Sequence, residues 1–268
     1  MLTVRSLRKT YRDPSGGPID ALRDCSLEVP EKTFTAILGR SGCGKTTLLK
    51  VIAGLEGADS GEAAFSRPGP TGPEGAPRPA PRVGFMFQDP RLLPWLTVEQ
   101  NLALAVPDPP GGRRRTAADK AALREETGRA LALVGLADRG GAYPAQLSGG
   151  MAQRAALARC LCRKPEILLL DEPLGSLDAL TRNNLRRELD RLWRELALTV
   201  ILVTHDIEEA VYLGDRVLVM DRGTMVSGLD IPLDRPRDYH GAEFQNYCKL
   251  IEGRIMKETP ARDGIDVE

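Results

Sequence analysis

Two stretches of the chain are glycine-rich turns of the kind that bind phosphate. The first, GRSGCGKT at residues 39–46, fits G-x-x-x-x-G-K-[ST], with an apolar run before it and a helix-forming run after it. Its glycines let backbone N–H groups close around phosphate oxygens, while Lys45 would reach the β- and γ-phosphates and the Thr46 hydroxyl would bind Mg²⁺. The expected nucleotide contacts here are Gly39, Arg40, Ser41, Gly42, Cys43, Gly44, Lys45, Thr46 and Thr47.

An acidic pair follows the apolar run ILLL at 167–170. Asp171 ends that run and can hold Mg²⁺ directly or through water, and Glu172 is suited to polarise the water that attacks the γ-phosphate. The same pair could merely cap a helix, but the phosphate-binding loop earlier in the chain favours the catalytic interpretation. We therefore expect ATP and Mg²⁺ as ligands, with Thr46 and Asp171 binding the metal.

The second glycine-rich turn, LSGG at 147–150, precedes another helix-forming run. Ser148, Gly149 and Gly150 are suited to bind an anion at the N-terminus of that helix. One nucleotide needs only one phosphate cradle. The second turn is therefore either a weak phosphate site within the same chain or a contact for a nucleotide held by another chain.

Five short apolar runs must position these residues, and each ends in a polar or glycine-rich turn. They occupy residues 33–39, 83–89, 166–173, 199–206 and 216–223. Runs that stay apolar without alternating are typical of strands covered on both faces, and helix-forming stretches separate most of them, which predicts an α/β fold. Polar residues at the carboxyl ends of such strands gather in one crevice. Those residues are here Lys45, Gln88, Asp171, Glu172 and His205.

Two segments have the composition of loops. Residues 67–82 are dominated by Pro, Gly and Ala, which predicts little regular structure. Residues 107–116 combine a Pro/Gly break with three arginines. These arginines are either part of a solvated loop or a contact for acidic lipid or a partner.

Two further segments lie outside the strand pattern. The spacing of Leu123, Thr127, Ala130 and Val134 predicts an amphipathic helix over 117–137, which with the second turn would form a small helical insertion. After residue 236 the alternation of strands and helices stops, which predicts a polar C-terminal extension over 237–268.

The overall composition excludes several classes of protein. Lys+Arg and Asp+Glu both number 37, so the formal charge is zero and gives no support for a broad nucleic-acid-binding face. The five cysteines have no metal-ligand spacing, which is typical of reduced thiols in a cytosolic protein. The sequence starts without a signal-peptide pattern, and no apolar stretch approaches the ~20 residues that span a bilayer. Any membrane role is expected to act through a partner.

The turn LSGGMAQ at 147–153 resembles the signature sequence of ATP-binding cassette (ABC) proteins, and the resemblance covers about residues 1–230. The matching elements, in chain order, are Tyr11 in LRKTYRD, the phosphate loop, Gln88 in MFQDP, the signature, Asp171–Glu172, GSLD at 175–178 and His205 in VTHD. The resemblance implies a P-loop NTPase (RecA-like) core with a mostly parallel sheet, a small antiparallel β subdomain and a helical signature subdomain at about 96–160. An ATP-binding domain of residues 1–236 would contain all three.

The resemblance also implies what the second turn binds. In a head-to-tail dimer, Ser148, Gly149 and Gly150 would bind the γ-phosphate held by the opposite subunit. Asp178 would face that subunit near its signature. The other roles that the resemblance implies are adenine stacking for Tyr11, sensing of Mg²⁺ and of the attacking water for Gln88, and contact with the γ-phosphate for His205.

Three residues depart from the family pattern without removing a catalytic group. Ala152 stands in the signature where many relatives have a basic residue, and Leu174 and Ser176 stand where relatives often have Phe and Ala. The Pro-rich stretch 67–82 also replaces a more regular β segment.

The segment 88–104 places Leu92, Leu93 and Trp95 just after Gln88, which suits a groove for a partner helix, although the chain itself could cover them. The sequence of this segment, together with LGSLDALTR at 174–182, is similar to that of ATPase subunits of bacterial nitrate, sulfonate and taurine importers. The implied complex has two copies of this chain, transmembrane permease subunits and an external substrate-binding protein, with this chain peripheral on the cytoplasmic face of the inner membrane. The alternatives are a non-transport ABC ATPase acting on nucleic acid or the ribosome, and a P-loop kinase, which would not need the signature.

Overall fold

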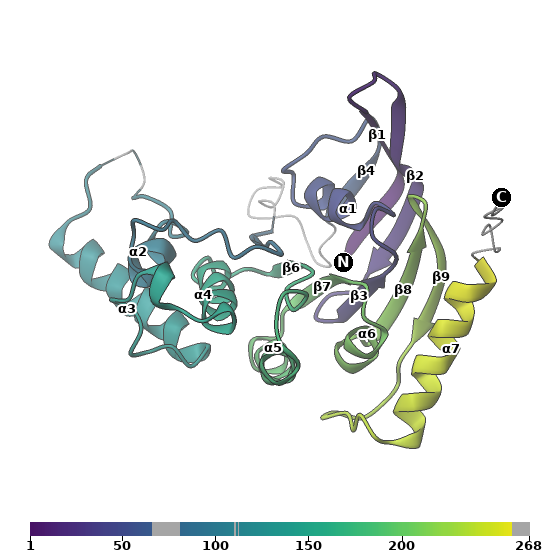
Figure 1. The fold of residues 1–268 in the computed structure, drawn as a ribbon. Helices are drawn as coiled ribbons and strands as arrows, with labels where there is room; N and C mark the ends of the chain where they lie inside the picture. The colour runs from purple at the N-terminus through teal and green to yellow at the C-terminus, as the bar shows by residue number, and fades with distance from the viewer. Residues whose placement is uncertain (66–80, 110, 112, 259–268) are drawn as a thin grey trace, which may run out of the picture.

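The computed structural model describes residues 1–65, 81–109, 111 and 113–258, which form two sheets with helices around them (Figure 1). The larger sheet has six strands in the order β5–β6–β7–β3–β8–β9, and the smaller has three in the order β2–β1–β4. The predicted α/β fold with a mostly parallel sheet is confirmed, and so is the small antiparallel β subdomain.

The five apolar runs form the parallel strands of the larger sheet. They are β3 (Phe34–Leu38), β5 (Val83–Met86), β6 (Ile167–Asp171), β7 (Thr199–Thr204) and β8 (Arg216–Asp221). Every residue of β3, β6 and β7 is buried, which explains why these runs do not alternate with polar residues. The edge strand β9 (Thr224–Asp230) runs antiparallel to β8 and was not expected, because Ser227 and Gly228 interrupt its apolar pattern.

The smaller sheet consists of β1 (Leu2–Arg12), β2 (Pro18–Val29) and β4 (Ser60–Phe65). Its buried residues, among them Leu2 and Val4, share an apolar cluster with Leu48 and Leu49 of helix α1 (Lys45–Ile52), so this sheet packs near the start of the P-loop helix. The loop predicted at 67–82 lies almost entirely outside the described residues, which resume at 81.

A group of helices lies to one side of the larger sheet (Figure 1). It contains α2 (Val98–Ala103), α3 (Ala117–Leu133), the 3₁₀ turn η3 (Pro144–Gln146) and α4 (Gly149–Leu161). Ala130 and Val134 of the predicted apolar stripe are buried. Helix α3 stops short of the expected Ala137 because Gly135, with φ 67°, turns the chain out of the helix.

Two of the three arginines of the segment 107–116 make side-chain contacts within the chain. Arg113 forms an ion pair with Asp119 at 2.5 Å. Arg115 donates to the carbonyl of Val106 at 2.9 Å and pairs with Asp108 at 3.1 Å. These contacts favour the loop interpretation of this segment.

Three helices complete the fold: α5 (Ala179–Leu196), α6 (Ile207–Leu213) and α7 (Ala242–Glu258). Within the C-terminal extension predicted after residue 236, α7 packs against α6 and β9 and buries Phe244 and Ile251. Phe244, Tyr247 and Ile251 are spaced to fall on one helix face, and the polar residues between them hide that stripe in the average composition.

Arg237 anchors the chain just before α7. Its guanidinium is buried and donates to the carbonyls of Val211 at 2.5 Å, Gly214 at 2.6 Å and Ile231 at 2.8 Å. Burial lowers the pKa of Arg237 to about 10. The side chain thereby satisfies the carbonyls at the C-terminus of α6, which lack helical partners.

We expect Arg237→Met to lower the free energy of unfolding by about 2–3 kcal/mol, because the buried carbonyls lose their donor and cannot reach water. Urea denaturation followed by circular dichroism measures this loss. The surface substitution Arg222→Met, on an exposed side chain, is the control and should change stability by less than about 0.5 kcal/mol. Equal stability of both variants would contradict the anchoring role of Arg237.

None of the helices in the described part of the chain has the length and apolar character needed to cross a bilayer. All five cysteines are free, and four of them are buried.

Candidate nucleotide-binding site

The phosphate loop connects the end of β3 to the start of α1. Gly42 and Gly44 have φ values of 80° and 106°, which L-residues with side chains rarely adopt. A Cβ on Gly44 would lie 2.2 Å from the Ala21 carbonyl oxygen, and one on Gly39 would lie 2.5 Å from that of Met220. Gly44 caps α1 without a side-chain hydrogen bond, so the first N–H groups of the helix are left for an anion.

Lys45 points its ammonium group across this loop. The side chain is 4% exposed, and Nζ donates to the carbonyls of Gly39 at 2.8 Å and Arg40 at 2.9 Å. The same nitrogen lies 3.7 Å from Oε1 of Glu172. A positive charge is therefore fixed between the phosphate loop and the predicted catalytic carboxylate.

Thr46 and Asp171 are also brought together as predicted. The Thr46 hydroxyl donates to Oδ1 of Asp171 at 2.8 Å, although the two residues are far apart in the sequence. Burial raises the pKa of Asp171, and the bond from Thr46 opposes that rise. A hydroxyl and a carboxylate at this spacing supply hard oxygen ligands, so the residues present fit a Mg²⁺ ion beside the phosphates.

Glu172 has a backbone conformation that is uncommon for its residue type. Its φ is 45°, its N–H donates to the Val203 carbonyl at 2.9 Å, and its Oε2 lies 3.0 Å from Nδ1 of His205. Left-handed backbone at a residue with a side chain costs about 1–3 kcal/mol and is found mainly at functional sites. Glu172 is therefore held with its carboxylate between Lys45 and His205.

Gln88 follows β5 and lies on the same edge of the sheet. A Cβ built on Gly175 would be 3.6 Å from Nε2 of Gln88 and 3.7 Å from Oε2 of Glu172, so both side chains reach one small volume. The Gln88 carbonyl accepts a hydrogen bond from Nε2 of Gln153 in α4 at 2.7 Å. The predicted convergence at the strand ends is thus present for Lys45, Gln88, Asp171, Glu172 and His205.

Helix α4 holds β5 and the segment after it at further points. Arg159 donates to the carbonyls of Pro90 at 2.8 Å and Arg91 at 2.7 Å, and the thiol of Cys160 donates to that of Phe85 at 3.2 Å. These bonds lie along the helix that begins at the second glycine-rich turn. The strand end carrying Gln88 is therefore fixed to α4 through its main chain.

Tyr11 lies near the end of β1 and is half-buried. Burial and the neighbouring Glu56 carboxylate raise the pKa of its hydroxyl, whereas Thr47 of α1 lowers it. The Lys9 ammonium lies 5.6 Å from the ring centre. The ring is thus next to the phosphate loop, and adenine stacking remains a prediction.

The second turn is built as a helix N-terminus. Ser148 caps α4 and accepts from the N–H of Met151 at 3.3 Å. A Cβ on Gly150 would lie 2.3 Å from Cγ2 of Thr181 in α5, whereas one on Gly149 would meet nothing closer than Leu177 at 3.8 Å. Gly149 therefore leaves the turn open toward solvent, and Gly150 lets α4 approach α5.

The two cradles lie apart in one chain. Helix α4 belongs to the group formed with α2 and α3, while α1 lies on the side of the antiparallel sheet (Figure 1). Asp178 caps α5, where the signature turn packs, and its bonds to N–H groups of α5 lower its pKa. The predicted residues thus form two clusters, one at the phosphate loop and one at the signature.

Sequence reasoning missed three residues that shape this site: Gln153, Thr204 and Glu209. Gln153 could have been found, because it is the polar residue that ends LSGGMAQ, one helical turn after Gly149. Thr204 and Glu209 carry no comparable sequence signal, since their contact depends on how β7 meets α6.

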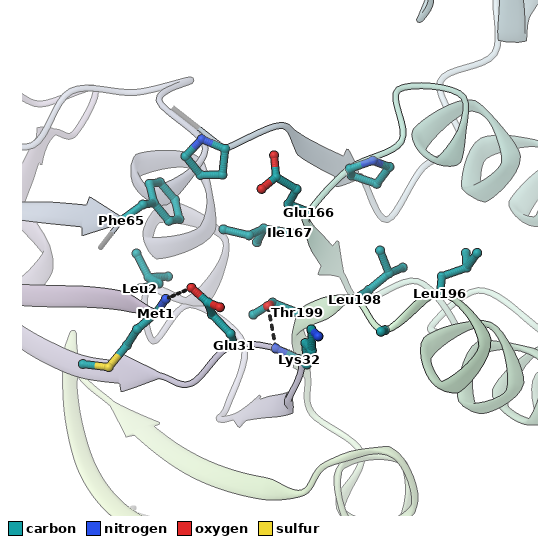
Figure 2. A pocket seen from close by; sticks show the side chains of 13 residues that line it. Met1, Leu2, Glu31, Lys32, Phe65, Glu166, Ile167, Leu196, Leu198 and Thr199 are labelled. Carbon is teal, nitrogen blue, oxygen red and sulfur yellow. Dashed lines mark hydrogen bonds and ion pairs between the residues drawn. The ribbon is translucent and has the colours of Figure 1, made fainter. Parts of the chain in front are cut away.

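A separate cavity of about 390 Å³ lies at the other edge of the larger sheet, where β6 and β7 begin (Figure 2). The amino group of Met1 pairs there with Glu31 at 2.8 Å, and the N–H of Lys32 donates to Thr199 at 2.9 Å. None of the predicted site residues lines this cavity. Open α/β sheets bind ligands at the carboxyl ends of their strands, so the nucleotide site is at the opposite edge.

Comparison with known proteins agrees with this geometry. The ABC transporter family matches residues 22–175. The chain is 45% identical to an aliphatic sulfonates import ATP-binding protein of Cupriavidus necator, over 97% of this chain and 78% of that protein, and 42% identical to one of Rhizobium johnstonii, over 95% and 86%. A dimeric ATP-binding cassette in a post-hydrolysis state, bound to ADP and Pi, superposes with a TM-score of 0.72 at 28% identity, over 87% of this chain and 100% of that one. The chain therefore belongs to the ABC transporter family, as one of its nucleotide-binding, ATP-hydrolysing cassettes.

Proposed function

We propose that this chain is the ATPase subunit of a bacterial importer for a small anion, of the nitrate, sulfonate or taurine kind, and that it works as a head-to-tail dimer. The observation that carries the dimer is the separation of the two cradles within one chain. The relatives named for aliphatic sulfonate import make a sulfonate the first anion to test.

In this proposal the catalytic groups keep the contacts that the fold gives them. Lys45 binds the β- and γ-phosphates, and Thr46, Asp171 and Gln88 hold Mg²⁺, which neutralises charge on the phosphates when bound. Glu172 accepts the proton of the attacking water. His205 holds the Glu172 carboxylate through their 3.0 Å contact and contacts the γ-phosphate.

The second cradle supplies the remaining contacts from the partner. Ser148, Gly149 and the N-terminus of α4 bind the γ-phosphate opposite, and Asp178 lies beside that interface. Donors that meet only the γ-phosphate distinguish ATP from ADP, so closure of the dimer follows ATP binding and is reversed by hydrolysis. We further propose that 1–236 is the ATP-binding domain and that 96–160 is its helical subdomain.

The permease contact is proposed at the loop after Gln88. Trp95 is 70% exposed, whereas Leu92 and Leu93 are half-buried, so Trp95 is the main anchor. Asn101 is buried and fixes this loop, donating to the carbonyls of Leu93 and Leu96, both at 3.2 Å. Because the loop is already fixed, an exposed aromatic side chain on it loses little conformational entropy when it binds a partner.

A neighbouring groove of about 330 Å³ supports this docking face. Its lining includes Leu55, Phe87 and Leu104 together with Arg159 and Arg163. Leu55 and Leu104 are exposed apolar residues, which suits the apolar side of a partner helix. Through this contact the chain would be held at the cytoplasmic face of the inner membrane.

We expect Trp95→Ala to weaken binding of the permease by about tenfold or more, because an exposed aromatic anchor is lost. ATP hydrolysis by the isolated chain should not change, since Trp95 makes no contact with the predicted catalytic groups. Calorimetric titration of the chain with the detergent-solubilised permease measures the affinity. Leu250→Ala, an exposed apolar residue on α7, is the matched control. Equal affinities for both variants would contradict this docking face.

The function as a whole is tested by reconstitution. The chain, its permease and the substrate-binding protein are placed in liposomes, and ATP hydrolysis is measured with an aliphatic sulfonate, taurine, nitrate or no anion. Stimulation by one of these anions, with uptake of that anion, supports the importer. If none of the three anions stimulated hydrolysis, the result would contradict this importer and support a non-transport ABC ATPase. The balanced charge of the chain does not favour that alternative.

A further inference from the structure

The turn between β7 and α6 carries His205 and is cross-linked to the first turn of α6. The Thr204 hydroxyl donates to Oε2 of Glu209 at 2.5 Å and accepts from the N–H of Asp206 at 3.0 Å. The Asp206 carboxylate accepts from the N–H of Glu209 at 2.9 Å. Thr204 and Glu209 are buried, while His205 is exposed, so the two buried side chains fix the turn from which His205 projects.

The same turn borders the catalytic cluster on two sides. The Thr204 carbonyl accepts from the N–H of Gly39 at 3.3 Å, at the start of the phosphate loop. His205 Nδ1 lies 3.0 Å from Oε2 of Glu172. A change in the backbone of this turn would therefore alter the distance between His205 and the carboxylate that it contacts.

Glu209 is costly to keep at this position for stability alone. Its side chain is 3% exposed, and within the described chain its Oε1 has no hydrogen-bond partner. Burial raises the pKa of Glu209 to about 7, the bond from Thr204 opposes this rise, the charge of Asp206 adds to it, and Arg186 and Arg182 of α5 also oppose it. A buried carboxyl group with one unpaired oxygen destabilises a fold. Stability alone therefore does not explain why Glu209 stands at this position.

We propose that Glu209 is a positioning residue for His205. Its carboxyl oxygen orients the Thr204 hydroxyl, the hydroxyl holds the N–H of Asp206, and the resulting turn aims His205 at Glu172. Glu209 is buried behind this turn and is proposed to act only through it. The inference rests on the proposed role of His205.

The test measures ATP hydrolysis by the full chain with His205→Ala, Glu209→Ala, Glu209→Gln, Thr204→Val and the double variant His205→Ala/Glu209→Ala. We expect Glu209→Ala and Thr204→Val to lower kcat by about tenfold to a hundredfold with KM for ATP within about twofold, because the catalytic geometry shifts while the binding groups stay. Glu209→Gln keeps an acceptor oxygen for Thr204 and should stay within about threefold of wild type. Glu208→Ala removes a charge from the exposed neighbouring position and should leave kcat unchanged.

The double variant decides whether Glu209 acts through His205. Glu209→Ala should cause no further loss when His205 is already Ala, because the residue that it positions is gone. An undiminished loss in that background would overturn the proposal, and so would wild-type kcat in Thr204→Val, even if Glu209→Ala failed to fold. Full activity of His205→Ala alone would instead reject the proposed role of His205.

Thermal denaturation at pH 5 and pH 8 checks that the carboxyl group is buried as described. Because the folded-state pKa lies above the ordinary value of about 4.3, the folded protein binds this proton more tightly, and its stability falls as pH rises through about 7. Gln has no proton to lose, so this loss of stability should be absent from Glu209→Gln. The Tm of the variant minus the Tm of wild type should therefore be larger at pH 8 than at pH 5. A difference that is the same at both pH values would overturn the proposal.

Discussion

Replacing Glu172 by Gln is expected to lower kcat for ATP hydrolysis by about 10²–10⁴-fold while leaving ATP affinity nearly unchanged. The amide has almost the same shape and can still contact His205, but it cannot accept the proton of the attacking water. Lys45 and the Thr46–Asp171 pair, which are proposed to bind the nucleotide and its metal, remain in place.

The Glu172→Gln variant should also accumulate as an ATP-bound dimer, because the γ-phosphate that joins the two cradles is no longer removed. Size-exclusion chromatography with light scattering, in ATP and in ADP, measures the dimer, and phosphate release measures kcat. Glu195→Gln, an exposed carboxylate on α5, is the matched control and should behave as wild type. Hydrolysis near the wild-type rate, or an unchanged monomer in ATP, would reject the proposed role of Glu172.

Gly149→Asp is expected to lower kcat for ATP hydrolysis by about 10²-fold or more without unfolding the chain. A Cβ at this position meets only Leu177 at 3.8 Å, so the fold tolerates a side chain. The added carboxylate would face the γ-phosphate held by the partner and repel it. Fluorescent-nucleotide titration of the monomer should show unchanged affinity for ATP, because the phosphate loop is intact. Loss of that affinity would mean that the signature turn acts within its own chain.

Mixing two inactive variants tests the shared site directly. Lys45→Ala removes the cation of the phosphate loop, and Gly149→Asp blocks the signature. In a head-to-tail heterodimer both defects fall on one site, and the other site has an intact loop and an intact signature. The mixture should therefore regain part of the wild-type rate, while each variant alone stays inactive. A mixture without activity would contradict the head-to-tail arrangement.

The parallel core could be predicted because its strands are buried on both faces, which leaves continuous apolar runs such as those of β6 and β7. The strand β9 and the helix α7 could not be recognised in the same way. β9 is an edge strand with Ser and Gly in it, and the apolar stripe of α7 is diluted by polar residues. Their assignment depends on contacts with β8 and α6, which local sequence does not encode.

The residues of the candidate site also fall into two groups, those recognisable from the sequence and those recognisable only from the fold. The glycines and Lys45 of the phosphate loop are recognisable because backbone conformation and charge restrict the residue types that can stand there. The contacts of Gln153 with Gln88 and of Glu209 with Thr204 join residues on different elements. No spacing rule predicts such contacts, so they required the fold.

The attachment of α4 to the segment after β5 limits how the molecule can move. Hydrogen bonds from Gln153, Arg159 and Cys160 join this helix to four carbonyls, one within β5, at Phe85, and three after it, at Gln88, Pro90 and Arg91. Rotating the helix without carrying Gln88 along would break several of them at once. The signature turn and the Gln88 loop are therefore expected to move together as one rigid unit, so that a displacement of either segment also displaces the other.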